Sequence, residues 1–287
     1  MPRLPRNPAD RVLRVRLKEP LRFQDLTERL ALKLSALPDY AGRAHFMPWH
    51  RLLGTPDFRG LTGVFSPLIH VAVEATDARV DGHGHLEIRG VTMLSKTLDG
   101  SGGIRRLLRE GTHEMFGPGG VLCGRVRFVN AFTRYDPDPA RRRVLELPPE
   151  WKLGAAPSRV ATDVPDLATL LPAGRRPDFA DPTPHVWHYG HSDANRHVNG
   201  IAYLRSMEEF VADGLLARGV DLSRLYCAAT RVVYRKPCFT GEGFRRVAWF
   251  QGEAPLVVVG AFHKLDDPPD AAAAVAVELT LRPLEDA

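Results

Sequence analysis

The sequence has little cysteine and no long apolar run. Its 287 residues contain three cysteines, Cys123, Cys227 and Cys238, whose odd number and wide spacing argue against a disulfide framework and a structural zinc motif. No apolar stretch approaches the ~20 residues that a membrane-spanning helix needs. The first residues carry charges without an apolar core, so we expect no secretory signal. Together these features predict a cytoplasmic protein with free thiols.

Lysine is also scarce. Only six of the 39 Lys and Arg residues are lysine, and the formal net charge is +5. Arginine clusters such as Arg105–Arg106 and Arg141–Arg143 have no interleaved aromatic residues, which argues against nucleic-acid binding. Each cluster is better interpreted as solvated surface, although the charge would also suit an acidic or phosphate-bearing partner. The sequence contains no Walker or strand–GxGxxG–helix pattern, so we expect no nucleotide cofactor.

The order of helical and strand-like segments suggests two units of one plan. In each half, one amphipathic helix precedes strand-like runs separated by turns. In the first half the predicted helix covers 21–37, with Leu26, Leu30, Leu34 and Leu37 at helical spacing and Pro38 at its end, and predicted strands cover 63–80, 85–98 and 121–135. In the second half the predicted helix covers 200–219 and ends at Gly219, and predicted strands cover 227–239, 243–252, 255–265 and 273–284.

Residues 154–184 are rich in Pro, Ala, Asp and Arg and show little periodicity, which is typical of a linker. A helix that buries one stripe needs a curved sheet around it. Two such units in one chain can join their sheets as the subunits of a dimer do. We therefore predict an α+β fold with two tandem units, 1–153 and 185–287, each a long central helix wrapped by an antiparallel sheet.

One stretch before the second helix, HSDANRHVNGIAYL (191–204), places polar residues at alternate positions. Asn199 is expected to cap the helix, because Asn accepts a hydrogen bond from a free N–H group of the first turn. The free N–H groups and the positive end of the helix dipole suit a developing oxyanion. Asn195 is suited to hold a carbonyl or an attacking water, and His197 to exchange a proton near neutral pH. Asp193 is suited to orient that histidine or to act as base or nucleophile itself.

This stretch resembles the signature of hotdog-fold thioesterases, Asp-x-Asn-x-His-Val-Asn-Asn with a following Tyr. Two further stretches, VVYRKPCFTGEG (232–243) and YDPDPARRRVLELPPEW (135–151), are similar to segments of double-hotdog acyl-carrier-protein thioesterases. The resemblance implies a double hotdog with the acyl tunnel in the first unit. It also implies hydrolysis of an acyl thioester, carried on acyl carrier protein or coenzyme A, without a cofactor.

The resemblance also assigns site residues. It implies a catalytic set of Asp193, Asn195, His197 and Cys238, and a substrate-binding set of Asn199, Gly200 and Tyr203. Where the relatives carry a Glu before the Cys of the downstream strand, this chain has Pro237. The missing carboxylate leaves open which group activates water, with Asp193 or Glu242 as replacements. Cys238 is either a site residue or a buried strand cysteine.

Two other functions stay open. A hotdog dehydratase or acyltransferase of fatty-acid or polyketide biosynthesis would keep the fold and change the reaction. A dehydratase would place a first-half histidine opposite a second-half carboxylate, and the candidates are His70, His83, His85 and His113. A non-catalytic acyl-binding protein is the second alternative, with Pro237 as its main support.

Other polar residues have less specific interpretations. His185, His188, His191 and His197 suggest a metal site, but this lead-in looks extended and no acidic or thiol partner has ligand spacing, so we expect no metal. His45, Trp49 and His50 either line a pocket or pack. Glu208 and Glu209 suit a solvated helix face better than the catalytic role that a helix Glu has in one hotdog subfamily. The expected partner is therefore an acyl thioester, with no nucleic acid and no membrane, bound by a monomeric pseudo-dimer or a homodimer.

Overall fold

The computed structural model describes residues 7–53, 63–80, 82, 84–134, 136, 138–161, 164–193, 196–268 and 270–284. Its centre is one 11-stranded sheet in the order β1-β4-β5-β6-β3-β10-β13-β12-β11-β8, with β9 also paired to β11. The first-half strands are β1 (Val12–Pro20), β3 (Leu68–Ala75), β4 (His85–Leu98), β5 (Ile104–Phe116) and β6 (Leu122–Ala131). The second-half strands are β8 (Phe179–Ala180), β9 (His185–Val186), β10 (Leu225–Tyr234), β11 (Gly243–Gln251), β12 (Leu256–Lys264) and β13 (Val275–Pro283). A small separate sheet joins β2 (Val64–Phe65) to β7 (Thr133–Arg134).

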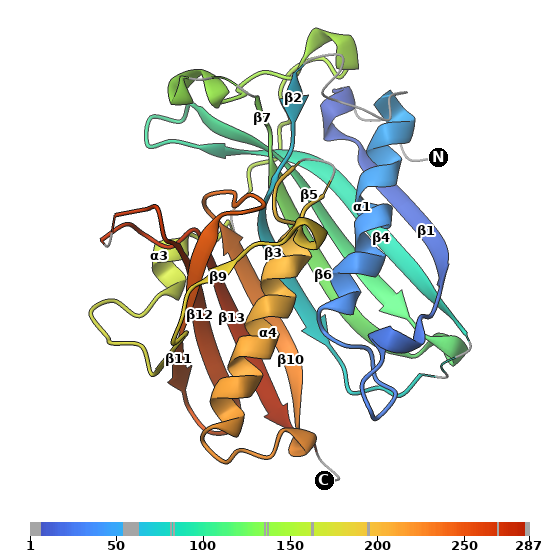
Figure 1. The fold of residues 1–287 in the computed structure, drawn as a ribbon. Helices are drawn as coiled ribbons and strands as arrows, with labels where there is room; N and C mark the ends of the chain where they lie inside the picture. Colours follow the sequence, from blue (N-terminus) through green and yellow to red (C-terminus); the bar gives the residue numbers. More distant parts are fainter. Residues whose placement is uncertain are drawn as a thin grey trace.

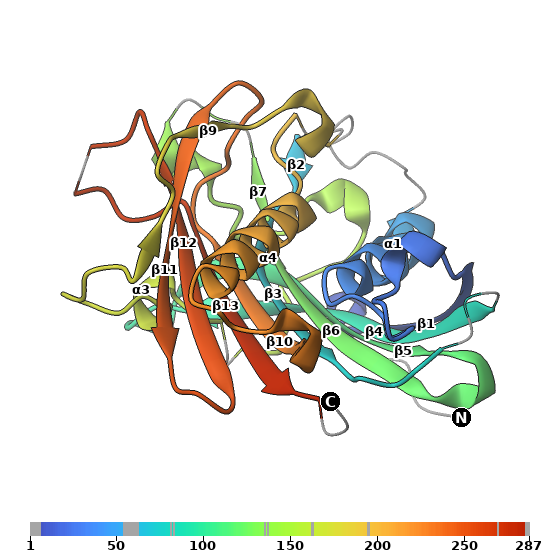
Figure 2. The ribbon, with the colours of Figure 1, turned by 60° about the horizontal axis from the view of Figure 1, so that its bottom comes forward.

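Two long helices lie on one side of the sheet, one over each half (Figure 1, Figure 2). They are α1 (Ala36–Leu53) and α4 (Gly200–Leu216). Read outward from the centre, the strand order is β3, β6, β5, β4 in the first half and β10, β13, β12, β11 in the second. The two halves therefore repeat one topology, and the predicted double hotdog is confirmed.

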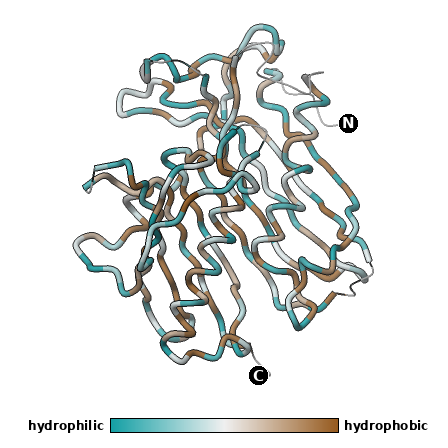
Figure 3. The backbone as a smooth tube through the Cα atoms, viewed as in Figure 1, coloured by the Kyte–Doolittle hydropathy of each residue, from teal (hydrophilic) through white to brown (hydrophobic). Residues whose placement is uncertain are grey.

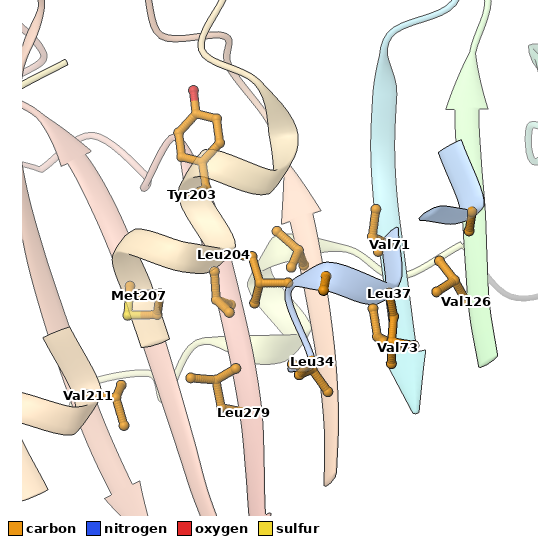
Figure 4. Close-up of a cluster of buried hydrophobic side chains, with 14 of the residues drawn as sticks. Leu34, Leu37, Val71, Val73, Val126, Tyr203, Leu204, Met207, Val211 and Leu279 are labelled. Carbon is orange, nitrogen blue, oxygen red and sulfur yellow. The ribbon is translucent and has the colours of Figure 1, made fainter. Parts of the chain in front are cut away.

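The halves meet at the antiparallel pair β3–β10, where Ala229 faces Glu74 and Val233 faces His70. Apolar residues follow the strands on both sides of this pair (Figure 3). One buried cluster crosses it, and its members include Leu34, Leu37, Val71, Val73, Leu204 and Leu279 (Figure 4). The two units consequently share one continuous core under their helices.

The predicted first helix is wrong in position. Residues 21–35 hold only a short 3-10 turn, Phe23–Asp25, and the α-helix begins at Ala36. Pro38 lies in the first turn of α1, where a missing N–H breaks no helical hydrogen bond, so it marks the start of the helix and not its end. Leu30 has a φ of 63° and is 42% exposed, so the leucines at helical spacing do not form one stripe.

Four strands were not predicted: the long strands β1 and β5 and the two-residue strands β8 and β9. β1 alternates between exposed and half-buried positions at the sheet edge. β5 carries charged residues and a glycine along its length, which obscures the apolar alternation of a strand. The strands predicted in the second half all form, within a few residues of their predicted ends.

The second helix also forms as predicted. Leu204, Met207, Val211 and Leu215 are buried along one stripe of α4. The helix ends in a Schellman arrangement, because Val220 N–H bonds to Leu215 O and Gly219 N–H to Leu216 O. Gly219 has a φ of 76°, which a glycine adopts without a steric penalty.

The predicted linker is docked along both units. Val160 bridges to Lys96 of β4, and β8 pairs with β11. The short helix α3 (Leu167–Leu170) buries Leu167 and Leu170 against Trp249, Val259 and Ala261. The unit boundaries at 153 and 185 stay a prediction. No helix in the described ranges combines the length and hydropathy that crossing a bilayer requires.

Candidate active site

The polar stretch before α4 folds into a narrow hairpin. Ser192 and Val198 form an antiparallel bridge, Asp193 N–H donates to His197 O at 3.0 Å, and Asn199 N–H donates to His191 O at 2.7 Å. Residues directly opposite in such a pair point their side chains to the same face. The alternation in the sequence thus reflects two arms of one hairpin, and Asp193 and His197 share a face.

Arg196 lies in the second arm of the hairpin, close to its tip. Arg196 N–H donates to Asp193 O at 2.9 Å, and Arg196 has a left-handed φ of 62°. Asn195, the third member of the predicted catalytic set, lies outside the described residues. The structure therefore pairs the backbones of Asp193 and His197, and the placement of Asn195 stays a prediction.

The start of α4 presents one unused donor beside this hairpin. Asn199 caps the helix as predicted, because its Oδ1 accepts from Ile201 N–H at 2.8 Å. Its carbonyl oxygen accepts from Ala202 N–H at 2.9 Å. Gly200 N–H has no acceptor among the described residues. The expected group of free donors is thus reduced to the Gly200 N–H at the positive end of the helix.

Gly200 is also where the first unit reaches the motif. A Cβ at this position would lie 3.0 Å from Tyr234 Oη and 3.1 Å from Leu68 Cδ2 of β3. The Tyr234 hydroxyl donates to Gly200 O at 2.9 Å. A larger residue would push these groups away, so the glycine permits close contact between the helix start and the first unit.

Cys238 and Tyr203 lie behind the hairpin. Val198 N–H donates to Cys238 O at 2.8 Å, and Cys238 N–H donates to Tyr203 Oη at 3.0 Å. Cys238 is 1% and Tyr203 2% exposed. Burial is the main cause that raises the pKa of the Cys238 thiol, and burial also raises the pKa of the Tyr203 hydroxyl. These bonds join the hairpin to the segment after β10 and that segment to α4, and the thiol is kept in its protonated, weakly nucleophilic form.

His197 contacts the ring of Phe239, a residue whose backbone also binds Glu242. The rings of His197 and Phe239 lie 5.4 Å apart in a T-shaped arrangement, and Phe239 is 40% exposed. Glu242 accepts from Phe239 N–H at 3.0 Å and pairs with Lys264 Nζ at 2.8 Å. Lys264 Nζ in turn lies 5.8 Å from the Phe239 ring centroid. Glu242 is therefore held by the turn after Pro237 and by Lys264, and sequence reasoning did not anticipate Phe239 or Lys264.

Two other expectations concern metal and the helix carboxylates. In the described part of the chain, no group of three or more His, Cys, Asp or Glu side chains is arranged to hold a metal ion. Glu208 was expected on a solvated face, yet it is half-buried beside Ser35. Burial raises the pKa of Glu208 to about 7, against the lowering effect of the hydrogen bond with Ser35.

Comparisons with known proteins place the fold. No protein-family model and no curated protein matches the sequence. Among solved structures, a candidate oleoyl thioesterase from Lactobacillus plantarum matches with a TM-score of 0.69 and 15% identity, over 96% of this chain and 97% of the other. The 12:0-ACP thioesterase from Umbellularia californica matches with a TM-score of 0.68 and 13% identity, over 94% of each chain. A MaoC-like dehydratase from Phytophthora capsici matches at 0.51 and 14%, over 96% and 97%. The chain thus has the double-hotdog fold along its whole length.

Proposed function

We propose that the protein hydrolyses an acyl thioester to a free carboxylic acid and a thiol. The observation that carries this proposal is the backbone pairing of Asp193 with His197, just before a helix whose Gly200 N–H has no acceptor among the described residues. A base and an oxyanion donor are what thioester hydrolysis needs. The likeness to solved thioesterases over almost the whole chain supports the same choice.

In this proposal water attacks the thioester carbonyl carbon and the C–S bond breaks. His197, oriented by Asp193, takes the proton of the water and then gives it to the leaving thiolate, which departs as the free thiol. The Gly200 N–H donates to the carbonyl oxygen as negative charge develops there. Asn195 keeps its predicted role in holding the carbonyl or the water.

Four predicted residues act indirectly in this scheme. Asn199 fixes the helix start through its cap, while Cys238 and Tyr203 support the hairpin from behind. Glu242 is bound to Lys264 and to a backbone N–H. We therefore choose Asp193 as the acting carboxylate, in place of the Glu that the resembling thioesterases carry where this chain has Pro237.

A dehydratase is the second candidate, because a MaoC-like dehydratase shares the fold at a TM-score of 0.51. The first-half histidines give it less support. His113 contacts His45 and Phe128, which both belong to the first unit, and His85 is exposed at the start of β4. His70 lies in β3 opposite Val233. His83 lies outside the described residues.

The test is thiol release from acyl-coenzyme A and acyl-carrier-protein substrates of increasing chain length. His197→Ala should lower kcat/KM by about 10²- to 10⁴-fold, the usual contribution of a general base. His85→Ala is the matched control, since His85 is exposed and far along the chain from the motif. Equal turnover by both variants would contradict the site. Absence of turnover with every substrate would contradict the function.

A further inference from the structure

The interior of the first unit contains a charge that its own fold does not neutralise. Arg109 lies on β5 facing α1 and is 1% exposed. Its Nε and Nη2 groups have no hydrogen-bond partner among the described residues. The ring centroid of Phe46 lies 4.2 Å from its guanidinium carbon. Glu110, the next residue, points to the opposite face of the sheet and pairs with Arg127 at 3.0 Å.

Two further donors lie on the elements around Arg109. The Thr92 hydroxyl on β4 and the Trp49 indole N–H on α1 are buried and have no hydrogen-bond partner in the described part of the chain. Thr92 pairs in register with Gly111, two residues from Arg109 on the same face of β5. Trp49 packs in one cluster with Leu94 and Leu107. Leu94 pairs with Arg109 from the neighbouring strand β4, and Leu107 lies two residues before Arg109 on β5. Arg109, Trp49 and Thr92 each offer a donor, against one unpartnered acceptor of the cluster in the described residues, His113 Nδ1. An acceptor is therefore the ligand group that complements most of them.

Neighbouring histidines are held in a fixed, neutral form. Asn130 Nδ2 donates to Ser66 O at 2.8 Å, so its Oδ1 accepts from His45 Nε2 at 2.8 Å. His45 Nδ1 then accepts from His113 Nε2 at 3.3 Å. Burial is the largest cause lowering the pKa of both rings, to about 4 for His113, and Arg109 further lowers that of His45. Arg109 is thus the cation of this cluster at neutral pH, and burial lowers its pKa to about 9.

The second unit shows that the fold does not require these polar residues. By strand order and by glycine position, β5 corresponds to β12, and Gly111 beneath His45 corresponds to Gly260 beneath Met207. The residues that pair with or flank each glycine then correspond as well. Thr92, Arg109, His113 and Asn130 match Ala248, Val258, Phe262 and Leu279, which are all buried and apolar.

The cluster also adjoins the candidate active site. Asn130 pairs in register with Leu68, whose Cδ2 lies 3.1 Å from where a Cβ of Gly200 would stand at the start of α4. An acyl chain that begins at the hairpin and runs under α1 would therefore approach Arg109 along the inner face of β6 and β5. We propose that the first unit binds a carboxylate on the far end of the acyl chain, with Arg109 as its counter-ion and Thr92 as a second donor.

A carboxylate fits this site for two reasons. An isolated buried cation is unstable unless an opposite charge accompanies it, and a guanidinium matches a carboxylate with two parallel hydrogen bonds. A plain methyl end would leave the same donors without acceptors. A site built this way discriminates strongly against a ligand that lacks the matching group. This inference rests on the proposed thioesterase function for the source of the carboxylate.

The kinetic test compares ω-carboxyacyl-coenzyme A substrates with methyl-ended substrates of equal length, from four to twelve carbons. The wild type should prefer the ω-carboxy substrate at the best length by more than about tenfold in kcat/KM. Arg109→Val, the residue of the second unit, should abolish that preference and retain turnover of the methyl-ended substrate. Thr92→Val should reduce the preference by about threefold to tenfold.

Thr97→Val is the matched control. Thr97 is also a β4 threonine with a buried, unpartnered hydroxyl, but it lies five residues along, on the other face by strand alternation. Its replacement should leave the preference unchanged. A wild type that shows no preference at any length, or an Arg109→Val protein with the same preference as wild type, would overturn the inference.

A binding arm separates this inference from the proposed function. Calorimetry with free hexanoate and hexanamide on the full chain should show binding of hexanoate alone, lost in Arg109→Val. That result without any thioester turnover would support the anion site and overturn the hydrolase. Turnover without carboxylate preference and without hexanoate binding would support the hydrolase and overturn the anion site. Arg109-dependent hexanoate binding with no acyl preference would assign the site to a free carboxylate and overturn the acyl-chain proposal.

Discussion

The two units solve the same packing problem with opposite chemistry. In each, a glycine on the third strand from the centre makes room for a side chain of the central helix, 2.3 Å from where a Cβ would stand. Met207 fills that space in the second unit, and His45 fills it in the first. The fold therefore sets the space above each glycine, whereas the sequence of each unit decides whether a polar or an apolar side chain fills that space. Polar groups retained where apolar ones suffice point to a ligand.

The glycines give the largest expected effect on stability. Gly111→Ala would place a Cβ against the His45 ring, which is held between Asn130 and His113. Gly260→Ala would meet the flexible end of Met207. We expect the first change to destabilise the fold by about 3 kcal/mol and the second by about 1 kcal/mol, because methionine adapts its shape and the bonded ring does not. Urea denaturation measures both, and equal losses would contradict the contrast.

Acid should destabilise the first unit through His113. Its folded pKa of about 4 lies below the ordinary 6.5, so the unfolded chain binds more protons between these values. The stabilisation is therefore complete above pH 6.5 and is lost as pH falls through 4, a change of roughly 3 kcal/mol. His113→Phe, the residue of the second unit, should flatten unfolding free energy against pH in this window, although His45 keeps part of the slope. An unchanged slope would contradict this account.

Removal of the buried charge should stabilise the protein. Arg109→Val takes an unpaired guanidinium out of the core and should raise the free energy of unfolding by about 1 to 2 kcal/mol. The gain is reduced by the lost contact with Phe46. Thermal unfolding without ligand checks it. A clear loss of stability would mean that Arg109 serves the fold and would remove the contrast between the units.

The smallest effect concerns the helix cap. Asn199→Ala removes the bond to Ile201 N–H and should lower the free energy of unfolding by about 1 kcal/mol. Asn199→Ser keeps an oxygen acceptor and serves as its control, with most of that loss restored. Denaturant unfolding distinguishes the two. Equal stability of the alanine and serine proteins would show that the cap contributes little.

The sequence predicted the second unit better than the first, for physical reasons. α4 has a side-chain cap, an apolar stripe and a terminal glycine, which all agree. The first helix was predicted too early in the sequence, because a proline is compatible with either end of a helix and Pro38 was assigned to its end. β5 was not predicted because Arg109, Gly111 and His113 interrupt its buried face.

The site was predictable only in part. The residue types of the motif and its place before a helix follow from the sequence. The pairing of Asp193 with His197 depends on a hairpin whose register is set by hydrogen bonds such as Val198 to Cys238. Leu68 and Gly200 lie close together although they belong to different units. A local sequence pattern cannot predict such a long-range approach.

The central claim is hydrolysis at the hairpin before α4, and oxygen-isotope labelling tests it most directly. The protein is incubated with an acyl thioester in H₂¹⁸O, and the products are analysed by mass spectrometry. The account predicts a free acid that carries one ¹⁸O atom from the solvent, formed by the wild type and lost in His197→Ala. An intact thioester that has gained or lost water, or an acyl group transferred to another acceptor without ¹⁸O, would contradict it.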